Sequence, residues 1–176
     1  VAGALGLAAA GGGGGGGGTV AATLGNSFSG QLVNGYIKDA RVFQDNNGNG
    51  LFDAGEPTGT TDSSGRFALA GFISGGGEIV AQPTWTNSAG ETVTATDQTT
   101  GATVTTVFKA PAGSSVVSPL STLVSAGATQ DQIKQAFGLD DSIDLMNFDP
   151  IAAATAPGAS AAEVEAALNI KAASTS

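Results

Sequence analysis

A run of twelve residues, 45–56, places oxygen-bearing side chains at a regular spacing, carries glycines between them and ends on a glutamate. A twelve-residue calcium loop has oxygen ligands at positions 1, 3, 5, 7, 9 and 12 and a glycine at position 6. Gly50 stands at position 6, and Leu51 at position 7 would contribute its backbone carbonyl. Because Ca²⁺ is a hard cation that takes about 6–8 oxygen ligands, the spacing predicts a Ca²⁺ site. The predicted ligands are Asp45, Asn47, Asn49, Leu51, Asp53 and Glu56.

The same run is open to a simpler interpretation, a polar turn that binds no metal. Asn, Asp and Gly are also the commonest turn residues. The joint placement of Gly50 and Glu56 favours calcium, because chance does not easily set both residues at the required positions. The loop offers three carboxylates and two amides, so one negative charge remains after Ca²⁺ binds. We expect a structural site that is filled at extracellular calcium levels and need not be a sensor.

The flanks of this loop predict strands, whereas a helical calcium hand would need an amphipathic helix on each side. Residues 31–43 contain glycine and asparagine breaks among β-branched and aromatic residues, and Val42 and Phe43 run into the loop. After the loop, a turn cluster at 60–65 precedes 66–72, where large apolar residues alternate with small or charged ones. The loop is therefore expected to stiffen a long connection between two strands.

Charge and composition exclude several classes of protein. The chain has 176 residues, the length of one domain, and its 6 Lys and Arg against 15 Asp and Glu give a net charge of −9. Such an acidic chain repels phosphate backbones and anionic membrane surfaces, so we expect no nucleic-acid partner and no membrane insertion. Cysteine is absent, which excludes disulfides and thiolate chemistry. Together with a calcium loop too weak for the cytosol, this favours a secreted protein stabilised by metal instead of by crosslinks.

The composition also argues against an enzyme. Histidine and cysteine, the usual general base and the strongest nucleophile, are both absent. Asp140 and Asp141 form an acidic pair that could suggest glycosidase carboxylates, but aspartates before Ile143 more readily begin a turn or cap a helix. A serine enzyme would need a Ser–Lys pair, and none of the lysines lies in such a motif. These lysines are Lys38, Lys109, Lys134 and Lys171.

The rest of the chain divides into a threonine-rich part and a helical part. Turn signals separate three expected strands, at 78–86, 91–96 and 103–108. Helices are then expected from N-cap and capping-box patterns, with Gly138 closing the second. Those patterns are Ser118-Pro119, Thr129 to Gln132, Asp149-Pro150 and Ser160 to Glu163, with the apolar stripes Ile133, Ala136 and Phe137, and Val164, Ala167, Leu168 and Lys171. Short helices need packing partners, so we expect them to pack on the sheet or on a neighbour.

The N-terminus differs from everything that follows it. Residues 1–10 are small and apolar, and residues 11–18 are eight consecutive glycines. One interpretation is the remnant of a secretion signal, and another is a flexible glycine linker. A third is a strand, with Val1, Leu5 and Leu7 on one face, that completes the open sheet edge of another copy. Such a head-to-tail contact does not close, so it would build a filament of copies of this chain.

Trp85 and Tyr36 are isolated aromatic residues with two possible roles. They could form a platform for sugar binding. Aromatic side chains more often serve burial, so we expect these two to be core or rim residues.

A resemblance emerges from the loop and its flanks. The stretch VFQDNNGNGLFDAGEP at 42–57, followed by TTDSSGRF at 60–67, resembles the calcium-stabilised, prealbumin-like β-sandwich modules of bacterial surface adhesins, including the B-repeats of serine-aspartate repeat proteins. APAGSSVVSPLSTLV at 110–124 resembles segments of large biofilm-associated adhesins of Gram-negative bacteria. The resemblance covers about 35–168. It implies secreted, non-enzymatic modules made rigid by Ca²⁺, and assigns the same six ligands to the loop.

These arguments together predict a mainly β protein, an antiparallel β-sandwich of the prealbumin or immunoglobulin-like type with short C-terminal helices. The expected parts are a glycine-rich arm at 1–27, a calcium-stabilised sandwich at 28–113 and a helical part at 114–176. The expected function is a secreted structural protein that self-assembles into an extracellular surface or biofilm-matrix filament through its arm. The alternative is an adhesin module that binds a glycan or a host surface.

Overall fold

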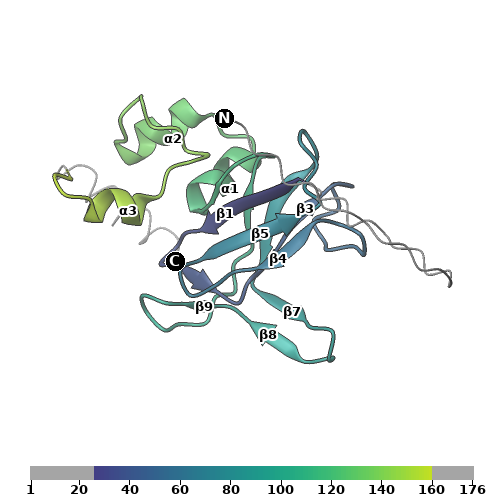
Figure 1. Cartoon of the computed structure of the whole chain (residues 1–176). Coiled ribbons are helices and arrows are strands. Elements are labelled where there is room, and N and C mark those ends of the chain that lie inside the picture. The colour runs from purple at the N-terminus through teal and green to yellow at the C-terminus, as the bar shows by residue number, and fades with distance from the viewer. Residues whose placement is uncertain (1–25, 160–176) are drawn as a thin grey trace, which may run out of the picture.

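The computed structural model describes residues 26–159, and these residues are mainly β, with several sheets and three short helices (Figure 1). The helices gather beside β1 (Ser27–Leu32), and the hairpin of β7 (Thr84–Thr86) and β8 (Thr92–Thr94) lies at the opposite end of the molecule. The elements are β1 Ser27–Leu32, β2 Ile37–Lys38, β3 Arg41–Asp45, β4 Thr58–Thr60, β5 Arg66–Ala70, β6 Glu78–Gln82, β7 Thr84–Thr86, β8 Thr92–Thr94, β9 Thr96–Asp97, β10 Phe108–Ala110, β11 Val116–Val117, α1 Pro119–Ser125, α2 Gln130–Phe137 and α3 Pro150–Thr155.

The strands form two larger sheets and two small ones. The four-stranded sheet has the order β10-β6-β3-β4, and the three-stranded sheet has the order β11-β1-β5. β2 pairs with β9, and β7 pairs with β8. The pairings are antiparallel as expected from the sequence, except that β11 runs parallel to β1. A parallel neighbour needs a long crossover, and the chain between β1 and β11 supplies it.

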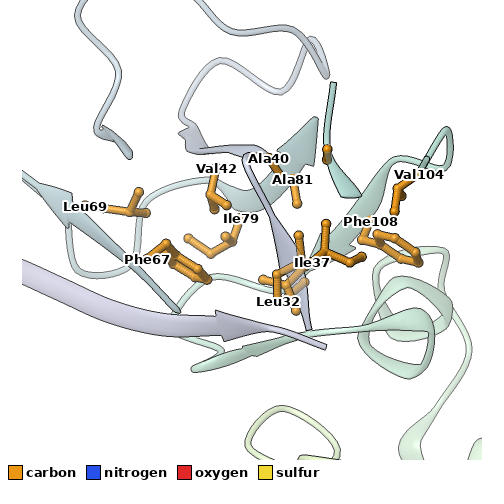
Figure 2. Close-up of a cluster of buried hydrophobic side chains, with 13 residues drawn as sticks. Leu32, Ile37, Ala40, Val42, Phe67, Leu69, Ile79, Ala81, Val104 and Phe108 are labelled. Carbon is orange, nitrogen blue, oxygen red and sulfur yellow. The ribbon is translucent and has the colours of Figure 1, made fainter. Parts of the chain in front are cut away.

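Both larger sheets contribute to one hydrophobic core (Figure 2). In β5 the predicted alternation is confirmed, because Phe67 and Leu69 are buried and the three residues around them are exposed. Leu69 is 0% exposed, so shortening it to alanine would create a cavity in a close-packed interior. The buried members of the cluster are Leu32, Ile37, Ala40, Val42, Phe67, Leu69, Ile79, Ala81, Ala95, Val104, Phe108, Ala110 and Val117.

All three strands expected in the threonine-rich part are wrong in extent, and the one expected at 91–96 is interrupted at Ala95 between β8 and β9. The strand expected at 78–86 is divided at Pro83, which has no N–H to give to a ladder, into β6 and β7. The strand expected at 103–108 is reduced to a single bridge at Thr103, and β10 begins only at Phe108. Threonine alternation favours extended backbone, but pairing decides which extended residues become strand.

The helices begin where their capping residues predict. Ser118 forms a capping box with Ser121 at α1, and Thr129 forms one with Gln132 at α2. Gly138 ends α2 in the left-handed conformation, with φ 65°, which suits glycine. Asp149 caps α3 through the N–H groups of Ile151 and Ala152, and the helices enclose a second apolar cluster of Leu120, Ile133, Leu139 and Leu145.

The expected apolar stripe of α2 is only partly right. Ile133 is buried and Phe137 is half-buried, but Ala136 is exposed. Lys134 is buried in its place and donates a 2.8 Å hydrogen bond to the carbonyl of Asp141. A lysine can bury its aliphatic stem and still satisfy its ammonium, which a pattern based on apolar residues does not detect.

The predictions for the arm at 1–27 fall almost entirely outside the described residues, as does the helix expected from Ser160. The domain boundaries remain predictions. Among residues 26–159, none of the helices has the length and hydrophobicity that crossing a membrane requires.

Candidate metal centre

The candidate calcium loop connects two neighbouring strands of the four-stranded sheet. Asp45 is the last residue of β3, and the chain returns at Thr58 as β4, antiparallel to β3. The prediction that the loop joins strands is therefore confirmed. The carbonyl of Pro57 accepts a 2.9 Å hydrogen bond from the N–H of Gln44, which fixes the two ends of the loop against each other.

The Asp45 carboxylate organises the first half of the loop. It is 3% exposed and accepts hydrogen bonds from three backbone N–H groups, those of Gly48 at 2.8 Å, Asn49 at 3.2 Å and Gly50 at 2.7 Å. The backbone can curl this tightly because Gly48 and Gly50 have φ of 74° and 75°, a region that glycine enters without steric cost. The predicted role of Gly50 as the turn residue is thus consistent with its conformation.

Asp53 brings the middle of the loop together. Its Oδ2 accepts 2.7 Å hydrogen bonds from the side-chain amides of both Asn47 and Asn49. The amide oxygens of these asparagines accept backbone N–H groups in turn, from Asn49 at 3.1 Å and from Leu51 at 2.7 Å. The side chains at loop positions 3, 5 and 9 are therefore neighbours in space as well as in the pattern.

Glu56 closes the loop. Its Oε1 accepts the N–H of Asn46 at 2.9 Å, and its Oε2 accepts the N–H of Asp53 at 3.0 Å. The last position of the loop is thereby joined both to its start and to position 9. The side chain of Leu51 is 63% exposed, in keeping with a position whose side chain has no predicted task.

The predicted ligands are of the type that a hard cation binds, on the condition that the amide oxygens of Asn47 and Asn49 become available to it. The five predicted side chains offer only carboxylate and amide oxygens, which Ca²⁺ prefers. Within residues 26–159, no three side chains of Asp, Glu, His or Cys form a group that could hold a metal ion. Calcium here would therefore depend on the oxygens of Asn47 and Asn49, whose amide nitrogens are bonded to Asp53. A half-turn of each amide would bring its oxygen to the side of Asp53, and would give up the bonds that these oxygens accept from the N–H groups of Asn49 and Leu51.

The loop also covers the face of the sheet that points away from the core. Successive side chains of a strand point to opposite faces, so Val42 enters the core and Phe43 does not. Phe43 is nevertheless 0% exposed, and Phe52 of the loop packs against it edge-on, with ring centroids 5.7 Å apart. The polar loop is thus anchored by one aromatic residue at its eighth position.

Arg41 adds a contact that the sequence analysis missed. Its guanidinium carbon lies 4.5 Å from the ring centroid of Phe52 and 4.4 Å from that of Trp85. Partial burial lowers the pKa of Arg41 below its ordinary value, and arginine remains charged at any physiological pH. The one available sequence signal was Phe52, a large aromatic residue in an otherwise polar loop.

The two isolated aromatics have structural partners. Trp85 is half-buried, lies against Arg41 and donates its indole N–H to the carbonyl of Asp39 at 3.0 Å. The Tyr36 hydroxyl donates to Asp149 Oδ2 at 3.2 Å, and burial followed by the Asp149 charge raises the pKa of Tyr36 above 10.0. Both are half-buried, in line with the expectation of core or rim residues.

The acidic pair after α2 forms a turn. Asp140 Oδ1 accepts both the N–H and the hydroxyl of Ser142, and these bonds lower the pKa of Asp140. The N–H of Ile143 bonds to the Asp140 carbonyl at 3.1 Å. This is the turn-forming role that the sequence predicted for the pair.

Comparisons with protein-family models, with curated proteins and with solved structures found no match for this chain.

Proposed function

We propose that this chain is a secreted, non-enzymatic structural protein, a β-sandwich stiffened by one Ca²⁺ in the β3–β4 loop. The observation that carries the proposal is the hydrogen-bonded ring at 45–56, in which Asp45, Asp53 and Glu56 each accept bonds from other loop residues. The ring holds Asn47, Asn49 and Asp53 next to one another, and the two asparagine amides would turn to offer their oxygens to a cation. The ligands would be Asp45, Asn47, Asn49, the Leu51 carbonyl, Asp53 and Glu56.

The physical benefit of the metal would be mechanical. The loop is largely exposed and its hydrogen bonds compete with water, so the loop gains little order from burial. A cation that binds only the folded loop stabilises the fold by about 2.7 kcal/mol at 100 times its Kd. The absence of cysteine leaves such a protein without disulfides as a source of extra stability.

Calorimetry and melting test this proposal directly. Titration of the chelator-treated protein with CaCl₂ should give saturable heat for one site, and EDTA should lower Tm by about 5–10 °C. Asp62→Asn is a suitable control, because Asp62 caps a turn outside the loop by accepting the N–H groups of Ser64 and Arg66. Absence of binding heat together with an unchanged Tm would refute the calcium site.

The assembly into filaments rests on the sequence of the arm. Residues 1–18 combine an apolar strand pattern with a polyglycine run that can approach another backbone closely. We expect the purified chain to form filaments visible by electron microscopy, and deletion of 1–18 to abolish them. Filaments that persist after this deletion would disprove the role of the arm and leave the calcium site unaffected.

One observation favours the alternative function, a glycan-binding adhesin module. Trp85 is half-buried, so part of its indole remains accessible beside Arg41. Aromatic rings with a nearby hydrogen-bonding side chain are able to stack on sugar rings. A glycan-array signal that disappears in Trp85→Ala, without self-assembly of the wild type, would favour this function over the filament.

A further inference from the structure

Three side chains connect the candidate metal loop to the β7–β8 hairpin. Phe52 belongs to the loop, Arg41 begins β3, and Trp85 is the central residue of β7. Both aromatic rings lie against the one guanidinium, at 4.5 Å and 4.4 Å from its carbon. Cation–π contacts at such distances are favourable, and more so where the groups are partly desolvated. We call these three residues the aromatic relay.

The hairpin depends on such contacts for its position. β7 and β8 pair only with each other among the described strands, and a two-stranded hairpin alone is at best marginally stable in water. Two further hydrogen bonds hold it to the same short segment. Trp85 donates to the carbonyl of Asp39 at 3.0 Å, and Arg41 donates to the carbonyl of Thr86 at 2.9 Å. Figure 1 shows the hairpin at the end of the molecule away from the helices.

The position of Phe52 depends on the conformation of the 45–56 loop. It lies between Leu51 and Asp53, which are the predicted ligands at positions 7 and 9. A backbone adjustment that brings both residues to a cation must move or fix Phe52 as well. Its ring also packs edge-on against the buried Phe43, so its position is defined by the sheet on one side and by the loop on the other.

We propose that cation binding in the 45–56 loop fixes the β7–β8 hairpin through the aromatic relay. This inference rests on the proposed calcium site and adds a device that the site alone does not imply. Coupling between a ligand and a conformation is reciprocal, so loss of the relay must weaken cation binding by the factor that describes the coupling. A single cation would thereby order two exposed segments of the sheet edge at once.

The chain carries its own reporter for this test, since Trp85 is its one tryptophan. In the intact protein, CaCl₂ should change the Trp85 emission with the same midpoint as the calorimetric heat. Calcium should also slow amide hydrogen exchange at 84–94. In Phe52→Leu, which changes no predicted ligand, the emission change should be lost and the Kd for Ca²⁺ should rise about 2- to 5-fold.

Phe28→Leu is the matched control. Phe28 stacks on Phe72 with ring centroids 4.4 Å apart, so the variant loses an aromatic pair of comparable size that has no part in the relay. It should keep both the emission change and the wild-type Kd.

The outcomes separate the relay from the metal site. Calcium heat without any response of Trp85 or of the 84–94 amides would overturn the relay and leave the calcium site standing. A full response in Phe52→Leu would overturn it as well. Absence of calcium heat would overturn both.

Discussion

Asp45 and Asp97 are nearly buried aspartates, 3% and 8% exposed, and each ends a strand and accepts backbone N–H groups from the turn that follows. Asp45 accepts from Gly48, Asn49 and Gly50, whereas Asp97 accepts from Thr99 at 2.7 Å and from Thr100 at 3.2 Å. Burial and backbone capping are therefore common to both. They do not by themselves distinguish a metal site from a structural turn.

The surroundings of the two carboxylates differ. Gly35 packs against Asp97 so closely that a Cβ there would overlap the carboxylate, and the Gly35 carbonyl accepts bonds from the N–H and hydroxyl of Thr99. Main chain thus fills the space around Asp97. Asp45 is followed instead by exposed side chains, and Asn47, Asn49 and Asp53 are bonded to one another beside it. The oxygen-bearing side chains beside the buried carboxylate are the feature on which the proposed cation site rests.

The largest expected effect concerns the surroundings of Asp97, where the main chain of Gly35 lies against the carboxylate. Gly35→Ala should destabilise the fold by about 2–4 kcal/mol, because the methyl group overlaps Asp97 and the backbone has φ of 102°. Urea denaturation measures this loss, which should not depend on calcium. Gly90→Ala is the control, since Gly90 has φ of 81° with no atom within 4 Å of an added Cβ, and should cost only about 1–2 kcal/mol. Equal losses in the two variants would contradict the steric argument.

The next effect separates the two aspartates by their response to calcium. Asp45→Asn should abolish the expected EDTA-dependent Tm shift of about 5–10 °C, because it removes one of the three carboxylate charges of the ligand set and one of the two oxygens at position 1. Asp97→Asn should lower Tm but keep that shift. Melting curves of both variants with CaCl₂ and with EDTA provide the measurement. If the calcium-dependent Tm shift survives in Asp45→Asn, Asp45 is no more a calcium ligand than Asp97 is, and the proposed difference between the two aspartates is contradicted.

The smallest effect concerns a third, exposed aspartate. The N–H of Met146, and secondarily Asn147, lowers the pKa of Asp144 below 3.8. A carboxylate with a lowered pKa stabilises the fold above its unfolded pKa, and the contribution is lost as the pH falls through the folded pKa. Solvent screening limits the contribution to about 0.5 kcal/mol. Urea midpoints of wild type and Asp144→Asn should therefore differ at pH 5 and converge once the pH falls below the lowered pKa of Asp144. A difference in urea midpoint that persists at low pH would show that the charge of Asp144 is not its cause.

Local sequence signals predicted those features that neighbouring residues decide. Ser118, Thr129 and Gly138 mark helix ends because caps act within one turn of the chain. The alternation at 66–70 predicted which residues of β5 are buried, because a strand has a period of two. The division of the strand at Pro83 could also have been predicted from proline's missing N–H.

The contacts around the loop could not be predicted in this way. Arg41 and Trp85 are far apart in the chain and meet only because β3 pairs with β6, which leads into β7. Lys134 is buried because the Asp141 carbonyl is within reach of its ammonium, which no periodicity reveals. The parallel pairing of β11 with β1 likewise depends on packing between distant segments.

By itself, the sequence determined the oxygen-rich loop between strands, the caps of the helices and the mainly β character, since these depend on side-chain chemistry and on periods of a few residues. Only the tertiary structure decided that Phe52 of that loop covers Phe43, and that Arg41 joins it to Trp85. The reason is that strand pairing brings together residues whose separation along the chain carries no information about their distance in space.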